Sequence, residues 1–161
     1  MSTKLKLGLF LIPAIAAIVF LIWWRSPTQV VLRRLDALLE LADVGALRLA
    51  PPDQLPGELS TLIAPSLDLR APLPVPSGTF TPDEIAAHMQ ELHGSVGSCR
   101  VHREDATVYF PSAGEARVET PLEAQLSWGR GSTRTNRYHG ELRFTRSAKG
   151  WLLDQVRLTP R

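Results

Sequence analysis

The chain has 161 residues and a formal net charge of +2. About 135 residues follow the first 25, which is enough for one domain with a core of ordinary size. The only cysteine is Cys99, so an intramolecular disulfide is excluded and cysteine usage does not indicate a redox compartment. Residues 26–97 carry a net charge of −5 and residues 98–161 a net charge of +4. This asymmetry fits self-association or docking on acidic lipid, and it equally fits ordinary solvated faces.

An uncharged run stands near the start of the chain, at residues 7–24, LGLFLIPAIAAIVFLIWW. Lys4 and Lys6 precede it and Arg25 follows it. As a helix it would be about 27 Å long, close to the ~30 Å hydrocarbon core of a bilayer. The run therefore predicts a single transmembrane anchor within a segment 1–25, and with one span no channel or transporter pore is expected from a single chain. A signal peptide cut at Ala14-Ile15-Ala16 and a buried soluble helix are the alternatives.

Basic residues on the two sides of this run are nearly balanced, so they do not fix its orientation. Trp23 and Trp24 suit the interface between lipid and water. We expect the short N-terminal tail to stay inside. The chain would then be a single-pass protein of the cell membrane with its main domain, residues 26–161, extracytoplasmic in the periplasm.

The first half of that domain, about residues 27–97, is expected to be mainly helical. Ser26 and Pro27 predict a helix start, and Gly45 predicts its end. The proline-rich stretch 46–78 allows a short helix around 57–63 and an edge strand in SLDLRAPLPVP. A second helix begins at Thr81-Pro82-Asp83-Glu84, a capping box. The apolar stripes of the two helices are Val31, Leu35, Leu38 and Ala42, and Ile85, Met89, Leu92 and Val96.

From Ser98 onward the apolar residues alternate with polar ones. RVHRED, ATVYF, EARVETPLEAQLSW, TNRYHGELRFTR and GWLLDQVRL are expected to be the strands of a meander over about 98–159. Turns are predicted at 111–114, 129–132 and 147–150. The fold class is α+β, with the helices packed on the apolar side of an antiparallel sheet.

The order of these elements resembles the nuclear transport factor 2-like superfamily, a group of cone-shaped α+β rolls that includes SnoaL-like and cystatin-like proteins. The resemblance is to membrane-anchored bacterial members of unassigned function, and it covers about residues 27–159. TPDEIAAHMQEL, HREDATVYFPSAGEARVETPLEAQLSW and ELRFTRSAKGWLLDQVRL carry it. It implies a cone-shaped roll with a curved sheet. Gly150-Trp151 is its sharpest piece, and a hairpin turn followed by an aromatic core residue would explain that pair equally well.

Enzymes of this superfamily place acidic, basic or phenolic side chains inside the cone. The residues at corresponding places would be His102, Tyr109, Tyr138, His139 and Asp154. Tyr138 and His139 are adjacent and so point to opposite faces of a strand. His88 and His93 are five apart, which does not match a metal-binding helix. We assign no catalytic, metal or cofactor residue. A cone pocket for a small apolar ligand would be lined by Tyr109, Trp128, Tyr138, His139, Phe144 and Trp151.

The sequence favours a membrane-anchored binding or assembly module without catalytic activity. The alternatives are an apolar-ligand-binding protein or a lyase or isomerase using the cone pocket, and an assembly factor of a secretion-type complex. The resemblance implies a homodimer through the open face of the sheet, and another protein is a further partner to consider. Nucleic acid is not expected, because Glu141 interrupts the basic residues of the second half and the acidic half offsets them. These basic residues are Arg130, Arg134, Arg137, Arg143, Arg146 and Lys149.

Overall fold

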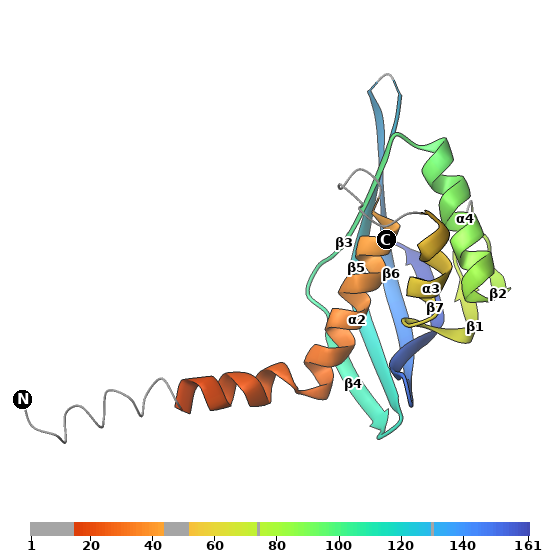
Figure 1. The fold of residues 1–161 in the computed structure, drawn as a ribbon. Helices are drawn as coiled ribbons and strands as arrows, with labels where there is room; N and C mark the ends of the chain where they lie inside the picture. The colour runs from red at the N-terminus through yellow and green to blue at the C-terminus, as the bar shows by residue number, and fades with distance from the viewer. Residues whose placement is uncertain (1–14, 44–51, 74, 130) are drawn as a thin grey trace, which may run out of the picture.

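The computed structural model describes residues 15–43, 52–73, 75–129 and 131–161. Helices cover one face of a twisted sheet, and a further helix projects from the domain (Figure 1). The helices are α2 (Pro27–Ala42), the 3-10 turn η1 (Pro52–Gln54), α3 (Leu55–Leu59) and α4 (Pro82–Ser95). The strands are β1 (Ile63–Arg70), β2 (Gly78–Phe80), β3 (Ser98–Arg103), β4 (Thr107–Ser112), β5 (Glu115–Trp128), β6 (Ser132–Ser147) and β7 (Gly150–Pro160). The α+β class is as predicted.

The sheet is mixed, so the prediction of a wholly antiparallel sheet is wrong. Its order is β2-β1-β7-β6-β5-β3, with β4 also paired to β5, and β1 runs parallel to β7. Alternation of polar and apolar residues shows that a segment is a strand but not which neighbour it chooses or in which direction. β1 also is not an edge strand, because β2 covers it. It tolerates Pro65 because its register against β7 shifts between Ile63 and Asp68.

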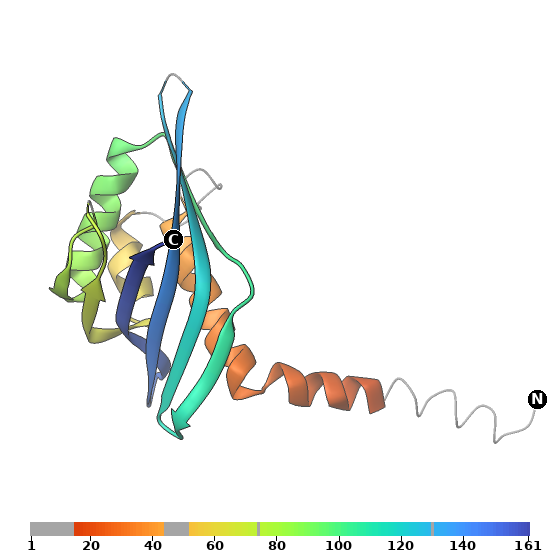
Figure 2. The same cartoon turned by 180° about the vertical axis from the view of Figure 1, so that it is seen from behind.

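The five strands predicted after Ser98 are confirmed. β3 and β4 both pair with the same side of β5, β3 with residues 122–127 and β4 with residues 115–119. The long strand β5 therefore pairs with two short strands along one edge. The sheet curves along its length (Figure 2). The first predicted turn is shorter than expected, because β4 continues through Pro111 to Ser112. The face of the sheet toward the helices is called the inner face below, and the opposite one the outer face.

The predicted helix starts are confirmed. Ser26 accepts a hydrogen bond from the Gln29 amide at 3.4 Å, and Thr81 and Glu84 form the full capping box. α2 ends at Ala42, whereas the predicted stop at Gly45 lies outside the described residues.

Three helical predictions need correction. The short helix is α3, which ends at Leu59 because Ile63 already begins β1, and β1 and β2 make the first half less helical than expected. On α4 the buried residue is Ala86, while Leu92 is 38% exposed. Ile85 and Met89 are partly buried and pack against the core, and Val96 is 8% exposed, so the predicted stripe faces the core except at Leu92.

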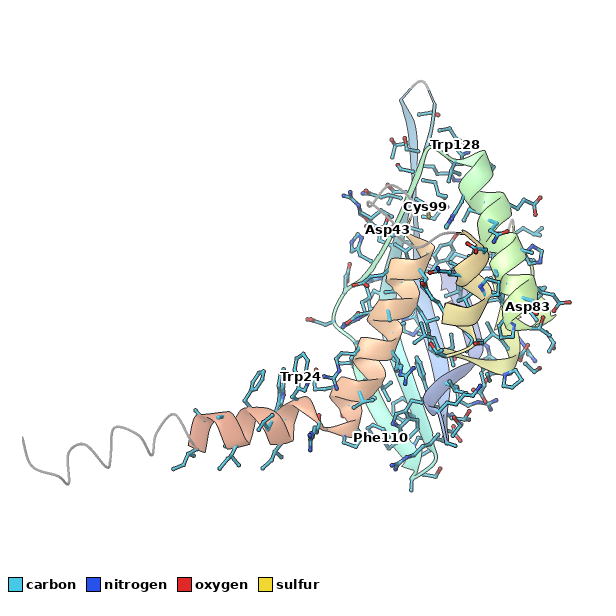
Figure 3. The ribbon with its side chains drawn as sticks, viewed as in Figure 1. Trp24, Asp43, Asp83, Cys99, Phe110 and Trp128 are labelled. Carbon is cyan, nitrogen blue, oxygen red and sulfur yellow. The ribbon has the colours of Figure 1, made fainter. Side chains whose placement is uncertain are left out.

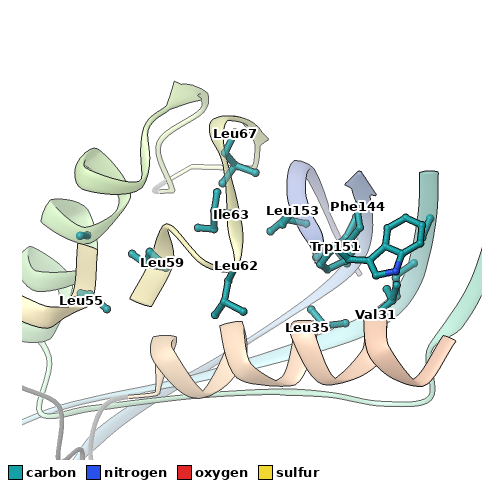
Figure 4. Packing of buried hydrophobic residues seen from close by; sticks show 14 residues of the cluster. Val31, Leu35, Leu55, Leu59, Leu62, Ile63, Leu67, Phe144, Trp151 and Leu153 are labelled. Carbon is teal, nitrogen blue, oxygen red and sulfur yellow. The ribbon is translucent and has the colours of Figure 1, made fainter. Parts of the chain in front are cut away.

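The core lies between α2, α3 and the inner face of the sheet (Figure 4). Phe144 and Val31 are fully buried, Leu35 is 1% exposed and Trp151 is 6% exposed. Gly150 has a positive φ of 100° in the β6–β7 turn, and Trp151 follows it into the core. Gly150-Trp151 is therefore a turn followed by an aromatic core residue.

One arginine joins three segments that are distant in sequence. Arg34 of α2 donates from Nη1 to the Thr61 carbonyl at 2.7 Å and from Nη2 to the Lys149 carbonyl at 3.2 Å. A Cβ atom on Gly150 would lie 2.9 Å from the same Nη2. Arg34 thus ties α2 to the segment before β1 and to the β6–β7 turn. The positive φ of Gly150 favours glycine there, and a Cβ would require the Arg34 side chain to shift.

A helix over Ile15–Trp24 projects away from the domain, and its large apolar side chains are exposed, from Trp24 at 45% to Ile22 at 69% (Figures 1 and 2). It meets α2 at a bend of 60°. In the described part of the chain, no unbroken helix has the length and apolarity of a membrane span, and only this bent pair reaches both together. The anchor predicted for residues 7–24 lies partly outside the described residues.

The first prediction concerns the core. Trp151→Ala should lower the free energy of unfolding by about 3–5 kcal/mol, because it removes a buried aromatic side chain and leaves a cavity. Urea denaturation of residues 26–161, followed by circular dichroism, measures it. Trp128→Ala is the matched control, since Trp128 is 37% exposed and should cost less than half as much. Equal losses in the two variants would contradict the packing.

The second prediction concerns Gly150. Gly150→Ala should cost about 1–2 kcal/mol because of its positive φ, and a further amount because Arg34 must move. Gly129→Ala is the control, with nothing within 4 Å of the added Cβ, and should be nearly neutral. In an Arg34→Ala background the cost at Gly150 should shrink, which a double-mutant cycle measures. An unchanged cost would show that Arg34 does not limit the turn.

Candidate functional site

The six predicted pocket residues do not converge on one place. Register and alternation put Trp128, Tyr138, Phe144 and Trp151 on the inner face. Phe144 and Trp151 are core residues, whereas Trp128 lies at the end of β5, near the end of the β5–β6 hairpin (Figure 3). Tyr138 is half-buried opposite Leu122. The interior of the cone between α2 and the sheet is filled by side chains.

Tyr109 and His139 lie on the outer face. The Tyr109 hydroxyl donates to Glu119 Oε1 at 3.2 Å, and Tyr109 pairs with Arg117 across the strands. His139 is half-buried, and its carbonyl accepts a hydrogen bond from the Thr159 hydroxyl at 3.4 Å. Tyr138 and His139 thus point to opposite faces, as their adjacency predicted.

The remaining acid–base candidates also lie apart. His102 is exposed on β3 opposite Glu123, and Asp154 lies on β7. Asp154 accepts a hydrogen bond from Arg143 Nε at 2.9 Å, a partner that adjacent sequence did not reveal. Arg143 and Asp154 are eleven residues apart and meet only because β6 and β7 form a hairpin. The contact holds Asp154 as one half of an ion pair.

The outer face carries a small hollow of about 170 Å³ around Tyr109. Its charges form rows across the strands, with Arg117 directly opposite Arg143 and Glu119 directly opposite Glu141. Like charges in direct opposition destabilise a sheet, so each needs compensation. Ion pairs within the chain compensate three of these charges. They are Arg117–Glu115 at 2.6 Å, Arg143–Asp154 at 2.9 Å and Arg157–Glu141 at 3.8 Å.

A larger and more acidic hollow, of about 710 Å³, opens between the C-terminal half of α2 and β3. Its carboxylates come from Asp36, Glu40, Asp43, Glu104 and Asp105. Asp36 binds Arg103 through two hydrogen bonds of 2.6 and 3.0 Å, and this contact raises the pKa of the guanidinium. The described residues contain no group of side chains suited to hold a metal ion.

Sequence reasoning did not identify the acidic hollow. Asp36, Glu40 and Asp43 follow a four- and three-residue spacing, which places them on one side of a helix. That spacing was an available signal. Nothing in the sequence indicated that these three residues approach Glu104 and Asp105, because that approach depends on the packing of α2 beside β3.

Cys99 lies on β3 and is 3% exposed. Burial, and secondarily the charge of Asp43, raises the pKa of the Cys99 thiol. The thiol is therefore a protonated core group at neutral pH and is no nucleophile.

The third prediction follows from this thiol. Its pKa is higher in the folded than in the unfolded chain, so the domain binds the proton more tightly when folded and should lose stability as the pH rises above about 8.5. Cys99→Ala should remove that part of the pH dependence, which urea midpoints at pH 7 and 9.5 measure. Iodoacetamide should alkylate the native wild-type thiol far more slowly than the unfolded one. Rapid native alkylation would contradict the burial.

No protein-family model matches the sequence, and no curated protein matches it. Solved structures do match. A nuclear transport factor 2-like superfamily protein from Salmonella enterica has 12% identity and a TM-score of 0.65, covering 84% of this chain and 91% of that one.

Two further matches carry a proposed activity in their descriptions. A proposed dehydratase of the NTF2-like family from Streptomyces avermitilis has 12% identity and a TM-score of 0.66, covering 84% of this chain and 97% of that one. A proposed scytalone dehydratase from Novosphingobium aromaticivorans has 14% identity and a TM-score of 0.58, covering 84% and 87%. At these identities the similarity concerns the fold. The chain has the nuclear transport factor 2-like fold that the sequence resemblance implied.

Proposed function

We propose that this chain is a membrane-tethered interaction module that uses the surface of its NTF2-like domain and not the interior of its cone. The observation that carries the proposal is the filled core. Phe144, Trp151 and Val31 occupy the space between α2 and the inner face, where a ligand of the cone would otherwise lie. A ligand there would have to displace tightly packed side chains.

The tether is supported by the helix over Ile15–Trp24. Its apolar residues are exposed all round, and a helix that is hydrophobic all round belongs in a protein core or in a membrane. The described part of the domain does not cover this helix, and a bilayer is an environment that its apolar surface fits. In this proposal residues 7–24 form the span, and the domain lies on the extracytoplasmic side of the cell membrane.

On the described surface, the acidic hollow beside α2 and the charged rows of the outer face are candidate contact regions. A protein partner with basic side chains would complement the carboxylates of Glu40, Asp43 and Asp105. Such a partner would be consistent with an assembly role.

A second copy of the chain is the partner that the outer face would fit. A two-fold axis running across the strands, between the arginine row and the glutamate row, would set Arg117 and Arg143 of one copy opposite Glu119 and Glu141 of the other. This arrangement would place opposite charges face to face across the interface, in addition to the ion pairs that Arg117, Arg143 and Glu141 make within each chain. A homodimer through the sheet is thus the second proposal for this surface.

We do not extend the dehydratase activity proposed for two structural neighbours to this chain. The side chains able to exchange protons are dispersed, with His102 beside the acidic hollow, Tyr109 on the outer face and Asp154 paired to Arg143. Acid–base catalysis needs such groups within hydrogen-bond reach of one reacting atom.

The fourth prediction tests the filled cone. Indole added to wild-type protein should show no saturable binding by calorimetry, whereas Trp151→Ala should bind indole because the variant contains a dry apolar cavity. Trp128→Ala is the matched control and should not bind, since the half-exposed Trp128 leaves no enclosed space. Saturable binding to the wild type would contradict the proposal and point to an accessible pocket.

A further inference from the structure

The bend between the exposed helix and α2 is built from specific contacts. The Ser26 amide donates to the Trp23 carbonyl at 3.0 Å, while the Ser26 side chain caps α2. The first helix therefore ends and the second begins within three residues, with a direction change of 60°. A junction this short leaves little freedom in the angle between the two helices.

Arg33 then holds the two helices together across the bend. Its guanidinium carbon lies 4.3 Å from the centroid of the Trp24 ring, and Nη2 donates to the Trp24 carbonyl at 2.9 Å. Phe20 stacks on the same indole at a centroid distance of 5.7 Å. A guanidinium over an indole face is an attractive contact, and the bond to the carbonyl adds direction to it.

We propose that Trp24, Arg25 and Arg33 form a collar that binds the phosphates of phospholipid headgroups and fixes the orientation of the domain on the membrane. This inference rests on the proposed membrane tether. A guanidinium has five N–H donors and the bond to Trp24 uses one, so donors are left for a phosphate. Indole and arginine side chains at one level of a helix are also the pair that suits the interface between headgroups and water.

In this proposal the collar determines which side of the domain faces the bilayer. The helix leaves the domain on the side of β3 and β4, while β2 lies on the opposite side (Figures 1 and 2). That near side carries the acidic hollow, including Glu104 and Asp105. Anionic headgroups would repel these carboxylates. These carboxylates therefore do not draw this side to the lipid, and in this proposal the collar sets the orientation: the contact between Arg33 and Trp24 fixes the angle, and the remaining guanidinium donors bind headgroup phosphates.

The test uses the full chain in phosphatidylcholine vesicles that contain a nitroxide-headgroup lipid. A fluorophore is attached at Thr107→Cys on β4 or at Thr79→Cys on β2, both exposed positions. Native Cys99 is 3% exposed, and unmodified protein serves as the labelling control. Vesicle flotation is measured first, so that failure of the tether is distinguished from failure of the collar.

Quenching at Thr107 should be several-fold stronger than at Thr79. Arg33→Gln, and independently Trp24→Leu, should bring the two values together while the protein still floats. Arg70→Gln is the matched control, since Arg70 is an exposed arginine on β1, and it should keep the difference. Protein that does not float overturns the tether and this inference with it. Flotation with equal quenching at both sites, or a difference that survives both collar variants, overturns the collar alone.

Discussion

The packing of α2 across the inner face of the sheet is the constraint on which the rest of this structure depends. Val31 and Leu35 bury the apolar side of the helix against Phe144 and Trp151, and Arg34 on the same helix binds two carbonyls that lie 27 and 115 residues away. Burial supplies the larger stabilisation but has no direction, whereas the hydrogen bonds of Arg34 set the position of the helix along the sheet. With α2 at that position, the helix covers the open side of the curved sheet.

Because the interior of the cone is packed with apolar side chains, the ionisable side chains lie on the surface of the domain. With aromatic and aliphatic groups filling the interior, the ionisable groups lie on the outer face and along the edge of α2. Most of them are paired, as in Asp36–Arg103 and Arg143–Asp154. Pairing fixes their geometry and neutralises much of their charge, which suits a recognition surface better than an acid–base site.

Local signals allowed much of this fold to be predicted. The capping residues Ser26 and Thr81 have partners three residues away, and most of β5 alternates between buried and more exposed residues, so local sequence is enough to predict these elements. The parallel pairing of β1 with β7 could not be predicted, because direction depends on contacts between residues almost ninety positions apart. The site was predicted less well for the same reason. Phe144 and Trp151, which were proposed as pocket lining, lie in the core, and periodicity alone does not distinguish the wall of a pocket from a filled core.

A crystal structure of residues 26–161 determined under xenon pressure is the most direct test of whether the cone is filled. Xenon enters apolar cavities that are accessible and empty. A filled cone predicts no xenon between α2 and the inner face, with Phe144 and Trp151 in van der Waals contact with the helix. An occupied xenon site beside these two residues would show that the cone holds a pocket, and the functional surface would then have to be sought inside it.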